Sequence, residues 1–213
     1  MPDYIVPIRV SEIGEFIRFR SCERRFKLGL ENRRLARSVP FSERLFNALD
    51  PVLQAVGREA ENAWERALRD QGATNLLEDV QPEDDNRTST WQAFRAAVTH
   101  LTAGAFVYGR EIEILHEVGT FELSGRMDFL VLLWDRGTPR LRVVEGKASR
   151  KDRTYHRLQL AAYVTMLRRL VRETPLMVSG QPIEEDSIEG VVVRIDETTN
   201  EPQDMIHRPA LNL

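Results

Sequence analysis

The sequence has little cysteine, no long apolar run and no glycine-rich phosphate loop. Its single cysteine, Cys22, excludes an internal disulfide, so we expect a reducing, cytoplasmic setting. No apolar stretch approaches the roughly 18 residues of a membrane helix, and the first ten residues lack the basic-then-apolar layout of a secretory signal. The lack of a phosphate loop argues against an enzyme acting on small nucleotides. We therefore expect no membrane partner.

The composition is that of an ordinary folded protein. The 213 residues are 42% hydrophobic and 30% charged, and a chain of this length can bury a sizeable core. We expect one domain over 1–213, with a mainly helical part over 1–106 and the central sheet over 107–213. The chain ends soon after its last predicted strand, which is compatible with a longer parent chain or a protein partner.

Positive charge is unevenly distributed along a chain of formal net charge −3. Residues 18–37 hold eight Arg or Lys against two Glu, and residues 136–172 hold eleven against Glu145 and Asp152. Two interpretations stay open on charge alone. The cations form either solvated helix faces balanced by acidic neighbours or a basic groove that follows the phosphates of nucleic acid.

Hydrophobic periodicity predicts helices in the first half of the chain and mainly strands in the second. Helices are expected over 11–30, 42–70 with a break near Pro51, 89–106 and 154–173. Strands are expected over 111–123, 127–134, 141–145 and 188–195, with a short edge strand over 204–208. The two central strands are joined by a turn that carries Asp135, Gly137 and Pro139.

Three charged residues stand inside the two central apolar strands. Charged side chains are rarely fully buried unless they are paired or ligate a metal. Because residues two apart on a strand share a face, Glu145 and Lys147 project together, and the hairpin can bring Asp128 beside them. Two carboxylates and an ammonium group at one spot favour a divalent-cation site beside a reacting group. The alternative is a satisfied buried ion-pair network.

These residues resemble the signature of the PD-(D/E)XK nuclease superfamily. Gly125–Asp128 looks like its first half and Glu145–Lys147 its second. Gln159 and Tyr163, four residues apart and therefore on one helix face, resemble the Gln-x-x-x-Tyr motif of the RecB-type branch. That branch includes CRISPR-adaptation exonucleases and recombination nucleases. The resemblance implies an α/β fold with a restriction-endonuclease-like core (α-β-β-β-α-β, central mixed sheet flanked by helices) and an N-terminal helical elaboration.

Two segments of the first half resemble further RecB-type motifs. Residues 19–30 are similar to the Cys-x-x-Arg-Phe segment that contributes a cysteine to an iron–sulfur cluster in some members. Since such a cluster usually takes four thiolates, Cys22 alone excludes it within one chain, and we expect Cys22 to be a small buried hydrophobe. Gly57–Glu61 resembles the Gly-x-x-x-His/Glu motif that supplies a further metal ligand, with Glu59 and Glu65 as rivals of Glu61. An ordinary surface glutamate is the alternative.

The resemblance implies metal-dependent hydrolysis of DNA, with an exonuclease favoured over an endonuclease. Mg²⁺ or Mn²⁺ would be held by four residues: Glu61, Asp128, Glu145 and the carbonyl of Gly146. Lys147 would orient the attacking hydroxide or stabilise the phosphorane, and Gln159 and Tyr163 would position the nucleophile or the strand. The setting would be DNA repair, recombination or defence. The alternative is a catalytically silent module that binds nucleic acid or a partner protein in a larger assembly.

Basic residues around the motif are candidates for phosphate contacts. They are Arg126, Arg150, Lys151 and Arg153. His116 has the chemistry of a metal ligand, but a hard cation such as Mg²⁺ prefers oxygen, so a structural role on a strand face is expected.

Overall fold

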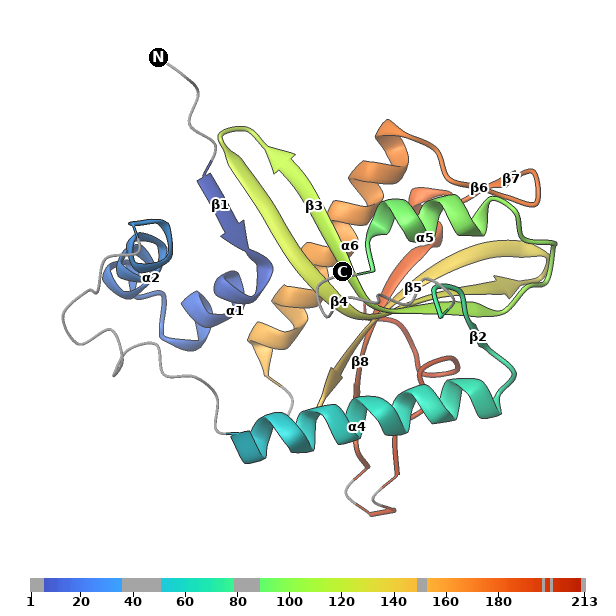
Figure 1. Ribbon diagram of the computed structural model, residues 1–213, viewed down its shortest axis with the longest axis horizontal. Coiled ribbons are helices and arrows are strands. Elements are labelled where there is room, and N and C mark those ends of the chain that lie inside the picture. Colours follow the sequence, from blue (N-terminus) through green and yellow to red (C-terminus); the bar gives the residue numbers. More distant parts are fainter. Residues whose placement is uncertain are drawn as a thin grey trace.

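The computed structural model describes residues 6–35, 51–78, 89–148, 153–196, 198–199 and 201–211. Within them a curled, mixed six-stranded sheet is flanked by helices (Figure 1). Its strands are β1 (Val6–Arg9), β2 (Thr74–Asn75), β3 (Val107–Val118), β4 (Phe121–Asp135), β5 (Thr138–Lys147) and β8 (Ile188–Arg194). The helices are α1 (Val10–Arg18), α2 (Glu23–Leu35), α4 (Pro51–Asp70), α5 (Trp91–Val98) and α6 (Thr154–Glu173). A hairpin of β6 (Met177–Val178) and β7 (Gln181–Pro182) and a 3₁₀ turn, η1 (Glu185–Ser187), precede β8.

The sheet is buried on both faces because helices cover each of them. Its strands run in the order β2-β3-β4-β5-β8, with β3, β4 and β5 antiparallel in turn and β8 parallel to β5. Alternate residues of each strand point to opposite faces. Leu130 and Val143 therefore join the core beneath α5 and α6, whereas Phe129 and Val144 join the core beneath α4 (Figure 1). Burial from both sides explains the continuous apolar runs of the central strands.

Strand β4 changes its partner along one edge. Residues 121–124 pair in parallel with β1, and pairing with β5 starts at Phe129, opposite Val144. Between them, residues 125–128 have no strand partner on this edge within the described part of the chain. The sheet therefore forks in the middle of β4, and the fork leaves room for side chains from β5 and α6.

Several predicted boundaries were wrong for local reasons. The helix expected over 11–30 is two helices, α1 and α2, because the chain turns at Arg20 and Ser21, both with a φ of 56°. The strand expected over 111–123 is split by a turn at Gly119, whose φ of 62° suits glycine. The helix expected over 89–106 ends at Val98. Strand β1 was not predicted, and residues 42–50 lie outside the described residues.

The edge strand expected over 204–208 was also wrong, since this segment is irregular. The Asp204 carboxylate accepts hydrogen bonds from the N–H groups of Ile206 and His207, which closes a local turn in place of a strand. The buried Arg142 guanidinium holds the turn against the sheet, donating to the carbonyl of Met205 at 2.9 Å. Among the described helices, none is both long and apolar enough to cross a membrane.

Cys22 is exposed, so the expectation of a buried hydrophobe was wrong. It follows the turn at Arg20 and Ser21, just before α2 begins at Glu23, and α2 lies apart from the sheet (Figure 1). A break in the predicted helix therefore accounts for its exposure.

Candidate active site

The fork in the sheet brings together Asp128 from β4 with Glu145 and Lys147 from β5. The β4–β5 register places Asp128 next to the last ladder pair, Phe129 and Val144. Its Oδ2 accepts a hydrogen bond of 2.7 Å from the Gly146 N–H and so takes the place of a backbone partner. The Lys147 ammonium is ion-paired with Glu145 Oε1. Two carboxylates and one ammonium thus share one spot on the sheet.

The charges of this cluster are not balanced. Glu145 is fully buried, and its Oε2 has no hydrogen-bond partner among the described residues. Burial, reinforced by the charge of Glu145, raises the pKa of Asp128 well above its ordinary value, and burial also raises the pKa of Glu145. Burial alone would lower the pKa of Lys147, but the two carboxylates outweigh it and raise that pKa, so the lysine is charged. An unpartnered buried oxygen in an excess of negative charge fits a bound divalent cation.

The backbone of β5 at this site is held from the α4 side. A Cβ on Gly146 would lie 2.6 Å from Cζ3 of Trp64, so the indole ring packs directly against the glycine. Trp64 is itself almost fully buried in the core beneath α4. Only glycine therefore fits between Glu145 and Lys147 with this ring in place.

Helix α6 contributes the two polar residues expected from its sequence. The Tyr163 hydroxyl donates at 2.9 Å to the carbonyl of Arg126, which lies on the bare edge of β4, the segment 125–128 that has no strand partner on this side among the described residues. Gln159 Nε2 lies 3.5 Å from the same hydroxyl. Burial, followed by the charge of Glu145, raises the pKa of Tyr163, so its phenol stays protonated. A Cβ on Gly125 would lie 2.5 Å from Tyr163 Cε1, which explains the glycine opposite the ring.

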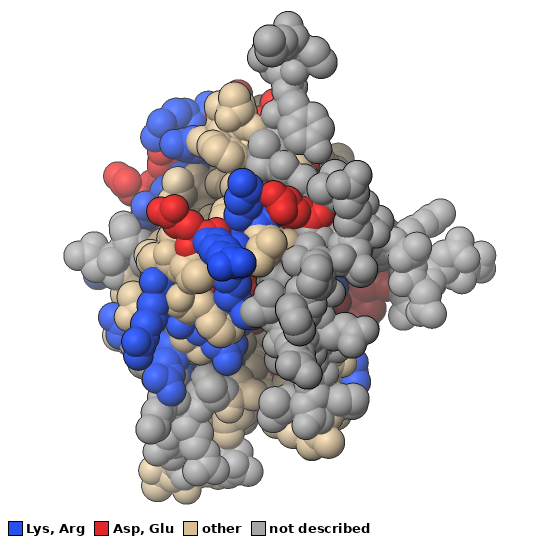
Figure 2. Space-filling model, turned by 90° about the vertical axis from the view of Figure 1, so that its left-hand side faces the viewer, with Lys and Arg blue, Asp and Glu red and all other residues tan. Residues whose placement is uncertain are grey.

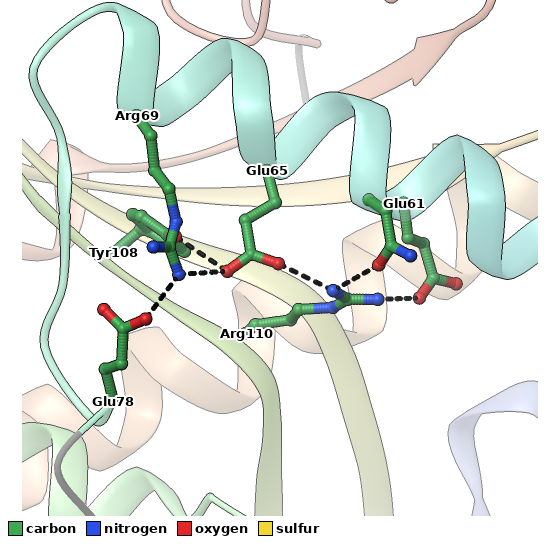
Figure 3. A network of polar contacts seen from close by, with 7 residues as sticks. Glu61, Glu65, Arg69, Glu78, Tyr108 and Arg110 are labelled. Carbon is green, nitrogen blue, oxygen red and sulfur yellow. Dashed lines mark hydrogen bonds and ion pairs between the residues drawn. The ribbon is translucent and has the colours of Figure 1, made fainter.

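Helix α4 places Glu61 near the cluster but pairs it with a cation. Glu61 Oε2 lies 3.2 Å from the Arg110 guanidinium (Figure 3). It is near enough for its charge to raise the pKa of Asp128. Within the described ranges no group of three or more His, Cys, Asp or Glu residues is arranged to hold a metal ion. The structure thus brings Asp128 close to Glu145 but holds Glu61 in an ion pair with Arg110.

The rival carboxylate Glu65 is committed to a network that sequence reasoning missed (Figure 3). Its Oε1 accepts from the Tyr108 hydroxyl at 2.8 Å and its Oε2 from Arg110 at 2.7 Å. Arg69 adds a third contact at 3.1 Å and continues to Glu78. These bonds fasten α4 to β3, and Glu59 is exposed on the same helix. The sequence feature that could have revealed this network is the four-residue spacing of Glu61, Glu65 and Arg69, which puts them on one face of α4.

Glu65→Gln should lower the free energy of unfolding at pH 7 by about 1–3 kcal/mol, because a charge-assisted network loses its anion. Hydrogen bonds from Tyr108, Arg110 and Arg69 outweigh burial and lower the pKa of Glu65. A carboxylate whose pKa is lower in the folded state stabilises the fold above its unfolded-state pKa. This stabilisation is lost as the pH falls through the folded-state pKa. Urea titrations of wild type and variant should therefore differ above the unfolded-state pKa of a glutamate, about 4.3, and converge as the pH falls through the lower folded-state pKa. Glu59→Gln is the control, and a pH-independent difference for Glu65→Gln would contradict this account.

A cleft of about 640 Å³ adjoins Asp128 along the bare edge of β4. Besides Asp128, its lining includes Gln159, Tyr163 and Arg126 from the predicted set. Sequence reasoning missed other polar residues that line it: Arg9, Ser11, Thr90, Gln92, Glu113, Glu122 and Ser124. Thr90 is the N-cap of α5, a feature readable from sequence, but its position beside the cleft depends on long-range pairing.

Of the remaining candidates, Arg126 lines this cleft. Arg126 has 57% of its side chain exposed and lies 3.8 Å from Glu111. Arg153 is exposed at the start of α6, and Arg150 and Lys151 lie outside the described residues. His116 is buried on β3, 4.0 Å from Glu173 and away from the carboxylate cluster, in the lining of a different cavity.

Comparisons with known proteins identify the family of this chain. The family model described as the PD-(D/E)XK nuclease superfamily, whose members typically use divalent metals, matches residues 15–210. The crystal structure of SSO0001 is similar at 17% identity and a TM-score of 0.42, covering 94% of this chain and 70% of that one. No curated protein matches the sequence. The match over most of the chain, on a sheet that joins Asp128 to Glu145 and Lys147, shows that the chain belongs to the PD-(D/E)XK nuclease superfamily.

Proposed function

We propose that this protein is a metal-dependent deoxyribonuclease that hydrolyses DNA phosphodiester bonds. One observation carries the proposal: in the buried Asp128–Glu145 pair, beside a charged lysine, one carboxylate oxygen has no hydrogen-bond partner among the residues that the structure describes. Such a pair is costly without a cation, because burial penalises both negative charges. Membership of a nuclease superfamily supports a catalytic role for this arrangement.

Asp128, Glu145 and the carbonyl of Gly146 would hold Mg²⁺ or Mn²⁺, with Glu61 as a further ligand once released from Arg110. A bound divalent cation lowers the pKa of a coordinated water and neutralises charge on the phosphate. Lys147, kept protonated by the carboxylates, would donate to a phosphate oxygen and stabilise the negative charge that develops there. The protonated Tyr163 would support the β4 edge through its bond to the Arg126 carbonyl, with Gln159 beside it.

We assign the chain to the RecB-type branch and favour an exonuclease over an endonuclease, with a cytoplasmic role in DNA repair, recombination or defence. Gln159 and Tyr163, which meet beside the cluster, support the branch. Arg126 and Arg153 would contact phosphates, together with Arg150 and Lys151. Residues 1–213 would act as one nuclease domain, alone or with a protein partner.

A catalytically silent module that binds nucleic acid is the second candidate. It is favoured by the two ion pairs that partly satisfy the site without a metal, Lys147 with Glu145 and Arg110 with Glu61. A silent module should bind DNA equally well with and without a divalent cation and should leave it intact.

A cleavage assay separates the two candidates. Linear and circular DNA, single- and double-stranded, should be incubated with Mg²⁺, with Mn²⁺ or with a chelator. We expect cleavage only with a divalent cation, and loss of linear before circular substrate for an exonuclease. Intact DNA under every metal condition, together with retained binding, would reject the nuclease and leave the silent module.

A further inference from the structure

The junction of α1 and α2 forms a strongly cationic surface that the candidate active site does not use. Residues 16–28 contain five cationic residues and one acidic residue. We call the basic corner the set Arg18, Phe19, Arg20, Arg24, Arg25 and Lys27. Figure 2 looks onto this end of the molecule and shows Lys and Arg side chains gathered on the face, with fewer Asp and Glu. Lys27 has an acidic neighbour, Glu31, at 4.0 Å, but this pair is exposed and contributes little. Glu12 and Glu15 line the hollow beside Phe19 and Arg25.

An exposed aromatic ring stands among these cations. Phe19 keeps 36% of its surface exposed. The Arg25 guanidinium lies over its ring, 3.7 Å from the centroid, and the Arg18 guanidinium lies 5.6 Å from it. Cation–π contacts of this kind hold the ring at the surface rather than in the core. The corner therefore combines a partly exposed aromatic ring, one face of which is covered by Arg25, with positive charge.

The backbone of the corner is strained at a charged residue. Arg20 follows the C-terminal cap of α1 with a φ of 56°, a conformation that favours glycine. Ser21 shares the same φ of 56°. Local rules of this kind are broken mainly where a side chain is needed for function. The arginine at this position is consistent with a charge retained for binding.

The basic corner leads to the cleft along helix α6. Helix α1 packs on α6 at Gly14, where a Cβ would lie 3.5 Å from the Tyr155 carbonyl and 3.9 Å from Gln159 Oε1. One turn later, the Arg18 guanidinium lies 5.8 Å from the centroid of the Tyr155 ring. Gln159 in turn lines the cleft that contains Asp128. The side chains of Arg18, Tyr155 and Gln159 thus follow one another from the basic corner to the cleft.

We propose that the basic corner docks a single-stranded segment of the DNA substrate and leads it past Tyr155 and Gln159 toward Asp128, an inference that rests on the proposed nuclease function. A single strand exposes the faces of its bases, which stack on aromatic side chains while arginines contact the backbone phosphates. A duplex hides those faces within its own stack. The combination of Phe19 with its arginines therefore fits a single strand rather than a duplex.

Two glycine substitutions separate the charge of the corner from its backbone strain. Both Arg20→Gly and Ser21→Gly relieve a left-handed residue, so each should raise the melting temperature by about 2–4 °C. Only Arg20→Gly also removes a cation. Fluorescence anisotropy of labelled single-stranded DNA in a chelator, which prevents cleavage, should show about fivefold weaker binding for Arg20→Gly and a salt dependence reduced by about one unit of slope. Ser21→Gly should bind as wild type does.

Phe19→Ala tests the stacking part of the proposal. It should weaken single-strand binding by about fivefold or more and change duplex binding of the same length much less. Equal binding of wild type and Arg20→Gly, or tighter binding of duplex than of single strand, would overturn the docking surface. Cleavage by wild type with Mg²⁺ is scored separately. If wild type cleaves DNA and Arg20→Gly binds it as wild type does, the basic corner alone is rejected. If Arg20→Gly loses binding but wild type does not cleave, the nuclease is rejected and the basic corner is kept.

Discussion

Lys147→Ala should reduce DNA cleavage by about 10³-fold or more, below detection in an ordinary assay. The lysine is the cation beside Glu145, and its raised pKa keeps it charged at every working pH. Alanine removes the positive charge that would face the developing phosphate anion. In a chelator the variant should also be less stable than wild type, because Glu145 loses the cation that offsets its burial.

Asp128→Asn is the matched variant, since it should lose cleavage to a similar extent and change stability in the opposite direction. Asparagine keeps an oxygen for the Gly146 N–H but removes one of two crowded negative charges. Thermal unfolding in a chelator should therefore show a higher melting temperature than wild type at pH 7. Because one inactive variant is destabilised and the other stabilised, unfolding cannot explain both losses. Full activity in either variant would contradict the assignment.

Gly146→Ala should lower the free energy of unfolding by about 1–3 kcal/mol and disrupt the active site at the same time. Its new Cβ would meet the Trp64 ring at 2.6 Å, so either the indole or the strand that carries Glu145 and Lys147 must move. Displacement of about 1 Å at a catalytic group is enough to lower activity by about 10²-fold. Urea unfolding and the cleavage assay measure the two effects.

The control for Gly146→Ala is the same substitution at Gly57. A Cβ there meets nothing within 4 Å, and the position lies inside α4, so alanine should stabilise by about 0.5–1 kcal/mol. A double-mutant cycle with Trp64→Phe then tests the contact itself, with a coupling energy of at least about 0.5 kcal/mol expected. Additive effects of Gly146→Ala and Trp64→Phe would show that the glycine is required for another reason.

The parts of the site that follow from short-range rules could be predicted from sequence. Side-chain alternation on a hairpin puts Asp128 beside Glu145 and Lys147, and helical spacing puts Gln159 beside Tyr163. The order of β3, β4, β5, α6 and β8 was likewise readable, since each element has a clear apolar period. These agreements depend on residues that are close in the chain.

The parts that sequence could not predict depend on contacts between distant segments. The pairing of β1 with β4 creates the fork that opens the cleft, yet β1 has only four residues and no pattern of its own. The Trp64 ring explains Gly146 only once α4 lies on the sheet. Glu61 and Arg110 are 49 residues apart, so the ion pair between them has no local signature in the sequence.

Anomalous X-ray scattering from crystals soaked in Mn²⁺ tests the central claim most directly. We predict one peak between the carboxylates of Asp128 and Glu145, about 2–2.4 Å from an oxygen of each, with Glu145 Oε2 among the ligands. The peak should vanish in Asp128→Asn crystals treated in the same way. An empty site in wild type, with manganese bound elsewhere or nowhere, would contradict a shared cation at the fork of the sheet.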